Sequence, residues 1–302
     1  MATFARPGFS AKAYAVFRPT YPPSVFRTVL GYHQLPLTGS DTTLLDLGCG
    51  HGLVARALSP HFHHVLGIDP SAGMVEQARR MTDDAKITFH HHRAEDLSAL
   101  VRPASVDMIV AGQAAHWFDH NTVFREMARA LKPGGTVAFW GYVDKVFVGA
   151  DKATAIMEKF VYGFGEVAPG IEGMGAYWEQ PGRNLLRNLL RSVEVPEDHW
   201  RDTTRLEHEP GKEDGENVGW LRKTMKLGEI ESYLHTFSCY SNWKDAHPGI
   251  KTRAEGGDGD VVDVMLDQMI DSTPGWKAMG EQWREAEVVC DWGTYLLMTR
   301  RK

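Results

Sequence analysis

The chain has 302 residues, of which 43% are hydrophobic and 24% are charged, so it can form one large domain with an insertion or two small domains. Its net charge of −6 argues against non-specific binding of nucleic acid, which requires a positively charged face. The first residues do not have the pattern of a secretory signal, and no stretch approaches the roughly 20 apolar residues of a membrane span. The three cysteines are scattered, which fits a reducing compartment, so we expect a cytoplasmic protein.

Short β-type runs alternate with helical patterns between residues 43 and 142. Strands are expected at TTLLDL, HHVLGID, KITFHHH, SVDMIVA and TVAFWGY. Helices are expected at LVARALS, at SAGMVEQARRM with Ser71 as its N-cap, and at NTVFREMARAL, which the KPGG turn ends. Strict alternation of strand and helix predicts right-handed βαβ crossovers and a doubly wound parallel sheet.

The alternation stops after residue 150. Helical periodicity dominates residues 150–285, and the polar stretch RLEHEPGKEDGENVG within it is predicted to be a surface loop. The closing AEVVCDWGTYLLMTRR contains two β-type runs that pivot near Asp291 to Gly293, which predicts a hairpin on the sheet edge. Four parts are therefore expected: an N-terminal helical cap at 1–40, a core at 41–144, a mostly helical lid at 145–285 and a terminal β-hairpin at 286–302.

A glycine-rich turn, DLGCGHG, follows the first strand, and three ligands are candidates for it: a dinucleotide, a phosphate and S-adenosylmethionine (SAM). Gly48, Gly50 and Gly52 are spaced one residue closer than the dinucleotide fingerprint requires, and no G-K-[ST] follows as in a P-loop. Asp46 just before them would repel a phosphate. SAM carries a sulfonium and an ammonium and no phosphate, so it fits this turn best, with a ligand-free tight turn as the alternative.

The next three strand ends also carry polar residues. Asp69 in GIDPS could accept both hydroxyls of a ribose, which NAD and SAM share, or could cap the following helix. RAEDL follows the third strand and AGQAAHWFD follows the fourth. Both lie where ligands bind in open α/β sheets, outside the carboxyl ends of the strands.

DLGCGHG, GIDPS, AEDL and QAAHWF together resemble class I SAM-dependent methyltransferases. FSAKAYAVFRPTYPPSVF and YLHTFSCYSNW resemble, more narrowly, the trans-aconitate methyltransferase and fungal farnesoic-acid-type group, and the resemblance covers nearly the whole chain. It implies a Rossmann-like α/β fold with a seven-stranded, mostly parallel sheet, an antiparallel terminal hairpin and a helical lid that binds the acceptor. It also implies SAM as cofactor and S-adenosylhomocysteine as product.

Carried over to this chain, the resemblance implies that Asp46, Gly48 and Gly50 hold the methionine part of SAM and that Asp69 holds its ribose. The full set of cofactor-binding candidates is Tyr14, Arg18, Asp46, Gly48, Gly50, Asp69, Met74, Ala94, Glu95 and Gln113. Ala94 and Glu95 would border the adenine. Many relatives have an acid where this chain has Arg93, which leaves the adenine amino group to Glu95 or to backbone.

The acceptor end is expected beneath the N-terminal segment AYAVFRPTYPPSVF, which its three prolines stiffen. Arg18 is predicted to bind a carboxylate, either of SAM or of the acceptor, through two parallel hydrogen bonds; a surface arginine stacked on a tyrosine is the alternative. Aromatic walls would shield a sulfonium and favour an apolar acceptor. The predicted substrate contacts are Tyr21, His116, Trp117 and Trp140, and the predicted catalytic residues are His116, Arg18 and Trp117.

The role of His116 depends on the acceptor. A hydroxyl needs a base, which an imidazole with a pKa near ~6.5 could supply. A carboxylate titrates near ~4 and needs none, so alignment and desolvation would suffice. We favour methyl-ester formation on a small, acidic or apolar molecule; the rivals are an O-, N- or S-methyltransferase of a secondary metabolite and a non-catalytic SAM-binding regulator. No metal site is expected, because consecutive histidines such as those at 90–92 point to opposite faces of a strand.

Overall fold

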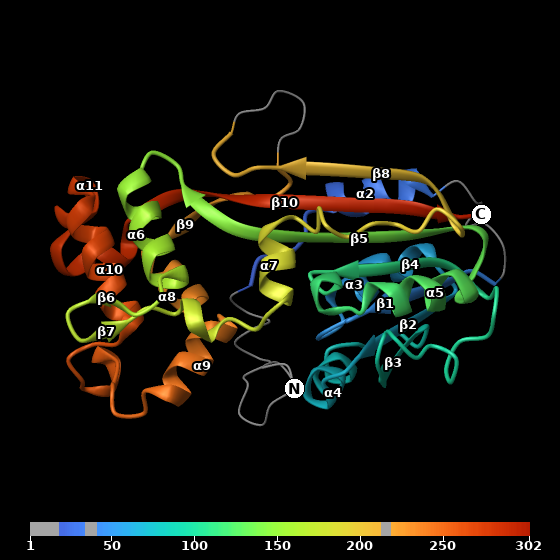
Figure 1. Ribbon diagram of the computed structural model, residues 1–302, viewed down its shortest axis with the longest axis horizontal. Coiled ribbons are helices and arrows are strands. Elements are labelled where there is room, and N and C mark those ends of the chain that lie inside the picture. Colours follow the sequence, from blue (N-terminus) through green and yellow to red (C-terminus); the bar gives the residue numbers. More distant parts are fainter. Residues whose placement is uncertain (1–17, 34–40, 213–218) are drawn as a thin grey trace.

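The structure, a computed structural model, describes residues 18–33, 41–212 and 219–302. An eight-stranded sheet, one strand more than the seven expected, forms its centre (Figure 1), in the order β3-β2-β1-β4-β5-β10-β8, with β9 paired to β10. The parallel strands are β1 Thr43–Leu47, β2 His64–Asp69, β3 Ile87–His91, β4 Val106–Gly112 and β5 Leu131–Phe147. Strand order reverses between β1 and β4, so the predicted doubly wound α/β fold is confirmed.

Helices cover both faces of this parallel half. One face packs against α2 Pro23–Tyr32, α3 Leu53–Leu58 and α4 Ala72–Arg80, whose apolar side chains share a core with Met108 and Val110 of β4. The other face packs against α5 His120–Ala130. Because successive strand residues point to opposite faces, an almost continuous apolar strand such as β4 fits a sheet that is covered on both sides.

Ser71 caps α4, as predicted, and its Oγ accepts a hydrogen bond from the Met74 N–H at 3.4 Å. We expect Ser71→Ala to lower the free energy of unfolding by about 1 kcal/mol, because the first turn of α4 loses an acceptor for an N–H that no helical carbonyl reaches. Urea denaturation followed by circular dichroism measures this change. The exposed Ser192 provides a matched control in Ser192→Ala. Overlapping curves for Ser71→Ala and the control would contradict the cap.

The end of the chain forms one strand, so the predicted hairpin is wrong. β10 Glu287–Arg301 runs antiparallel between β5 and β8 Trp200–His208, and its first part pairs with β9 Arg222–Lys226. The pairing with β5 shifts register between Trp292 and Thr294, where the sequence pattern suggested a turn. A Cβ on Gly293 would lie 2.5 Å from Val143, so glycine fits this bulge because the neighbouring strand packs against it.

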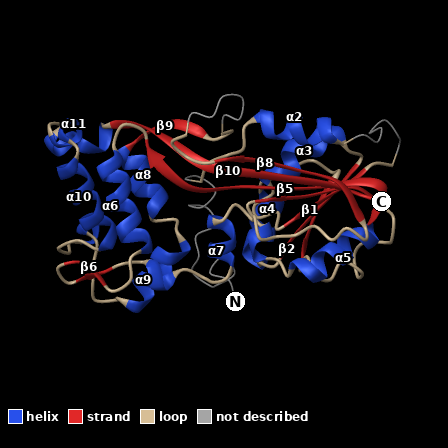
Figure 2. Ribbon diagram, turned by 45° about the horizontal axis from the view of Figure 1, so that its top comes forward, coloured by secondary structure: helices blue, strands red, loops and turns tan. Residues whose placement is uncertain are grey.

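The predicted lid at 145–285 is helical only in part. Its helices gather at one end of the sheet (Figures 1 and 2): α6 Asp151–Tyr162, α8 Leu227–Leu234, α9 Ser238–Ala246, α10 Val261–Ser272 and α11 Pro274–Lys277. However, β8 and β9 from the same range join the central sheet, and β6 Glu166–Ala168 pairs with β7 Ile171–Glu172. Residues 145–285 are therefore not a purely helical insertion, because two strands from this range complete the central sheet.

Two local predictions within that range also change. Part of the predicted surface loop belongs to β8, while residues 213–218 lie outside the described residues. The predicted helix at RNLLRNLLRSV reduces to α7 Gly182–Arg187, because Leu189 and Leu190 adopt left-handed backbone with φ of 53° and 55°.

The strands β5 and β10 run from the parallel half into the helical end (Figure 1). Phe147 of β5 and Trp292 of β10 are buried in the core of the helical end. A side chain near the end of β5 therefore faces the lid helices. Within the described ranges, no helix is long and apolar enough to cross a membrane.

Candidate functional site

A cavity of about 850 Å³ lies at the carboxyl ends of β1 to β4. The predicted residues that line it are Arg18, Tyr21, Asp46, Gly48, Gly50, Asp69, Met74, Ala94, Glu95, Gln113 and Trp117. Tyr14 lies outside the described residues. Almost the whole predicted cofactor set is thus brought to one cavity, at the switch point where open α/β sheets bind ligands.

The glycine turn lies against this cavity in a conformation that glycine favours. Gly48, Gly50 and Gly52 have φ of 67°, 54° and 83°, and a Cβ on Gly48 would lie 2.4 Å from the Cβ of Ala114. The Asp69 carboxylate accepts hydrogen bonds from the Gly50 N–H at 2.9 Å and from the Ser71 N–H at 2.8 Å. Asp69 therefore ties the turn after β1 to the turn after β2, in addition to lining the cavity.

Asp46 is a buried acid with half of its hydrogen-bonding capacity unused. Its Oδ2 accepts from the Ala55 N–H at 3.0 Å, whereas Oδ1 is buried and has no hydrogen-bond partner within the described ranges. Burial raises the pKa of Asp46 to about 7. An unpartnered carboxylate oxygen in a cavity wall is suited to a cation with N–H donors and unsuited to a phosphate.

Sequence reasoning missed several histidines of this cavity. His51, His91 and His92 line it, and the ring Nε2 of His91 lies 3.0 Å from the Pro70 carbonyl oxygen. The signal that could have found His91 and His92 is their place at the end of the third strand, where ligands bind. No group of three histidine, cysteine or acidic side chains in the described part of the chain is arranged to hold a metal ion.

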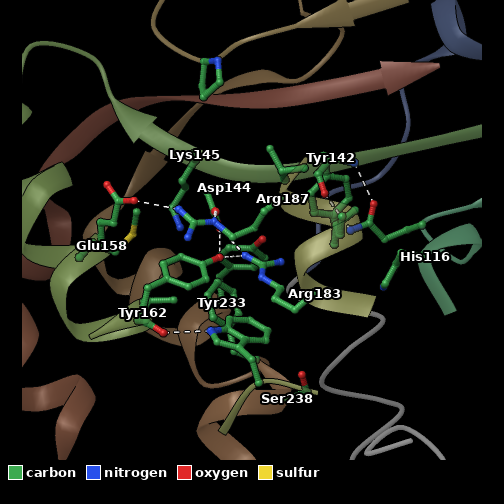
Figure 3. A pocket seen from close by; sticks show the side chains of 18 of the residues that line it. His116, Tyr142, Asp144, Lys145, Glu158, Tyr162, Arg183, Arg187, Tyr233 and Ser238 are labelled. Carbon is green, nitrogen blue, oxygen red and sulfur yellow. Dashed lines mark hydrogen bonds and ion pairs between the residues drawn. The ribbon is translucent and has the colours of Figure 1, made fainter. Parts of the chain in front are cut away.

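Figure 3 shows the side chains around a second, smaller cavity of about 280 Å³, which shares part of its lining with the first. Arg18, Gln113, Trp117 and Tyr142 line both. The Gln113 side chain donates to the Tyr142 carbonyl at 2.9 Å and accepts from the Tyr142 N–H at 2.8 Å, which ties the residue after β4 to β5. The two cavities, here called the large and the small chamber, therefore meet at Gln113.

The small chamber contains more positive than negative side chains. Its cationic residues are Arg18, Lys145, Arg183 and Arg187, and its acidic residues are Asp144 and Glu158. Asp144 pairs with both Arg183 and Arg187, and Arg187 also reaches Glu158 at 2.8 Å (Figure 3). The acidic groups thus neutralise only the two arginines that come from α7.

Lys145, which sequence reasoning also missed, is buried in the wall of the small chamber with 2% of its surface exposed. Its Nζ lies 4.4 Å from the ring centroid of Tyr233 and 5.9 Å from that of Phe237. Among the residues that the structure describes, no hydrogen bond or ion pair of its ammonium is found, although Cys290 and Asp144 are close enough to favour its charge. Burial lowers the pKa of Lys145 to about 8. A lysine within the apolar run of the fifth strand is the sequence signal that could have found it.

Arg18 lies where the two chambers meet. Its Nη2 donates to the Thr236 carbonyl at 3.0 Å, and its guanidinium stands over the rings of Tyr233 and Phe237 at 5.2 and 5.3 Å from their centroids. The arginine is thus held on aromatic rings and also faces both cavities.

His116 lines the small chamber and its ring packs on Trp117, with centroids 4.7 Å apart. Its Nδ1 is buried and has no partner in the described part of the chain. Burial, together with the nearby charges of Arg183 and Arg18, lowers the pKa of His116 to about 3. The ring is therefore neutral at physiological pH and a weak base.

Trp140 does not reach either chamber, so its prediction as a substrate contact is wrong. It is fully buried and packs edge-on against Tyr21 and Phe26, with centroids 5.7 and 6.1 Å away. The reason is strand alternation, since Trp140 points to the face that α2 covers.

Comparison with known proteins agrees with this geometry. Residues 45–139, which contain the glycine turn, Asp69 and Gln113, match the family described as "Methyltransferase domain". A solved structure from Anaeromyxobacter dehalogenans, assigned as a type II methyltransferase, has the same fold over 94% of this chain and 98% of its own, with a TM-score of 0.65 and 22% identity. Residues 45–139 therefore form a methyltransferase domain, and the chain is a SAM-dependent methyltransferase.

Curated relatives of this methyltransferase carry the same kind of name. "Probable S-adenosylmethionine-dependent methyltransferase CRG1" of Saccharomyces cerevisiae is 29% identical over 275 residues, which are 86% of this chain and 87% of the yeast protein. "Methyltransferase gedG" of Aspergillus terreus is 36% identical over 132 residues, 43% of this chain and 41% of its own. The likeness to the yeast protein extends well beyond residues 45–139 and includes most of the lid.

Proposed function

We propose that this methyltransferase transfers a methyl group from SAM to the carboxylate of a small-molecule acid, with SAM in the large chamber and the acid in the small one. We also propose that the chain belongs with the trans-aconitate and farnesoic-acid-type methyltransferases, which it resembles in sequence. Catalysis takes place where the chambers meet, at Gln113 and Trp117, which line both.

The large chamber suits SAM by chemistry as well as by position. The unpartnered Oδ1 of Asp46 can accept from the ammonium of the methionine part. Asp69 retains lone pairs for the ribose hydroxyls beyond its two backbone hydrogen bonds. Ala94 and Glu95 border the remaining end, where the adenine would lie. A volume of about 850 Å³ is within the range of sites for ligands of this size.

The observation that carries the choice of a carboxylate is the state of His116. Its pKa of about 3 makes it a poor acceptor for the proton of a hydroxyl near neutral pH, so it is unsuited to act as a general base. An acid titrates near ~4 and arrives ionised. The excess of cationic side chains in the small chamber also favours an anion over a neutral acceptor.

The transfer needs no proton movement on this acceptor. When bound, SAM supplies the methyl carbon, to which a carboxylate oxygen forms a C–O bond while the C–S bond breaks and its electron pair stays on sulfur. Because opposite charges cancel as the methyl moves, a dry site lowers the barrier. Arg18 and Trp117 exclude water at the junction and align the acid.

One observation favours a second candidate, a hydroxyl or amine acceptor. Lys145 has a pKa of about 8, so part of it is neutral near that pH and could remove a proton from such an acceptor. This role is assigned to Lys145 rather than to His116, because the lysine holds a proton far better.

The test is to incubate the purified protein with SAM labelled in its methyl group and, separately, trans-aconitate, farnesoic acid, palmitate, a phenol and a thiol. Label in a product that mild alkali hydrolyses is the expected result, since esters are base-labile. Label confined to a base-stable product would refute ester formation and support the second candidate. SAM bound without product under every condition would instead support a non-catalytic SAM-binding protein.

A further inference from the structure

Lys145 differs from the other cations of the small chamber in what surrounds it. Arg183 and Arg187 pair with Asp144, and Arg18 donates to the Thr236 carbonyl. The ammonium of Lys145 contacts aromatic rings alone in the part of the chain that the structure describes. The rings come from β5, α8 and β10 and from the turn before α9, so the packing of separate elements around this one charge forms its site.

Such a site is costly for a lysine. Burial removes the hydration of the ammonium, and contacts with ring faces recover only part of it. A hydrophobic side chain of similar length would fill the same space among Phe147, Tyr233 and Trp292 without that cost. A buried charge that lines a cavity and has no counter-ion is a recognised mark of a functional site, because the ligand can supply the counter-ion.

Resting on the proposed function, we infer that Lys145 is a specificity-determining residue whose ammonium binds the carboxylate of the acceptor acid. It faces the small chamber from β5, the strand whose Tyr142 backbone is held by Gln113 at the junction of the chambers. The guanidinium of Arg18 lies over the same two rings, of Tyr233 and Phe237, that the Lys145 ammonium contacts. An acid in this chamber is therefore close to two positive charges, those of Lys145 and Arg18.

If the Lys145 ammonium binds the acceptor, acceptor binding depends on the protonation of this lysine and therefore on pH. The charged or titratable side chains that face Lys145 are Arg18, Asp144, Tyr233 and Cys290. Asp144 is engaged by Arg183 and Arg187. Burial raises the pKa of Cys290 to about 11 and raises that of Tyr233, so both stay neutral below pH 10. Lys145 is then the group in this set whose charge changes as pH rises through about 8.

The wild-type enzyme provides the first test. With saturating SAM and an acid that is methylated in the panel above, kcat/KM for the acid is expected to be constant between about pH 6, where the acid is fully ionised, and pH 8. Above pH 8 it should fall about tenfold per pH unit, because the free enzyme loses the ammonium. The kcat value should stay flat, since a bound carboxylate keeps Lys145 protonated. If Lys145 were a base for a hydroxyl, the rate would rise through the same pH range, and the inference would be overturned.

Variants provide the second test. Lys145→Met is expected to raise the KM for the acid by about 10- to 100-fold and to abolish the alkaline fall, with the dissociation constant of SAM unchanged. Lys145→Arg, charged throughout, should retain affinity and also lack the fall. The matched control is Lys159→Met, which removes an exposed lysine of α6 and should match the wild type.

The outcomes separate this inference from the proposed function. Base-labile product with an unchanged KM and pH profile in Lys145→Met would overturn the role of Lys145 and leave ester formation in place. Absence of any base-labile product from every acid would overturn both. If Lys145→Met or Lys145→Arg failed to fold, the wild-type pH profile would still decide the inference.

Discussion

Replacing Asp46 with asparagine is expected to weaken SAM binding by about 100-fold or more while the chain still folds. Asparagine retains an oxygen for the Ala55 N–H but loses the negative charge at Oδ1 that the ammonium of SAM would meet. Removing one partner of a buried, hydrogen-bonded charge pair costs roughly 2–5 kcal/mol. Isothermal titration calorimetry with SAM measures the change, and Asp83→Asn, at an exposed acid, is the matched control.

The pH dependence of the same interaction gives an independent check. Asp46 must be ionised to bind a cation, and its pKa in the free protein is about 7, so SAM affinity should rise as pH increases through 7 and then level off. Stability of the SAM-free protein should change in the opposite direction. Because burial raises this pKa above its unfolded value, Asp46 opposes folding increasingly as pH rises from about 4 to 7. A pH-independent SAM affinity would contradict the assignment.

Arg18→Ala is expected to lower kcat/KM for the acid by about 100-fold, whereas His116→Ala should retain at least about a third of the wild-type value. Arg18 faces both chambers and can hold a carboxylate through two hydrogen bonds, and its loss removes charge at the junction. His116, with a pKa of about 3, is a weak base, and an ionised acid has no proton for it to remove. The alanine variant therefore loses only the packing of this ring on Trp117.

Steady-state kinetics with the acid that gives a base-labile product measures both variants. The matched control is Arg27→Ala, which removes an exposed arginine of α2. Arg18→Ala should lower the rate at every pH and keep the alkaline fall, which Lys145→Met lacks. The fall should move to higher pH, because the charge of Arg18 no longer lowers the pKa of Lys145. The reverse order of effects, with His116→Ala nearly inactive, would favour a hydroxyl acceptor and a histidine base.

The parallel half of the fold and most of the lining of the large chamber could be predicted because local signals agree there. Strand patterns end directly at the residues that line the large chamber, such as Asp46 and Asp69, and parallel strands bring their carboxyl ends to one edge of the sheet. The spacing of Gly48 and Gly50 marks a turn with positive φ. Each of these features depends on residues that are close together in the chain.

The small chamber depends on contacts between distant segments, which local sequence patterns do not specify. The sequence around Gly293 is typical of a turn. In the fold it forms a bulge packed against β5, and β10 is an inner strand of the sheet. Trp140 and Lys145 lie on the same strand, yet one is covered by α2 and the other faces the small chamber. Local turn chemistry in the sequence was enough to indicate the cofactor class. The charge of the small chamber depends instead on which side chains of β5, α7 and α8 pack around it, because long-range packing sets which face of each strand is open.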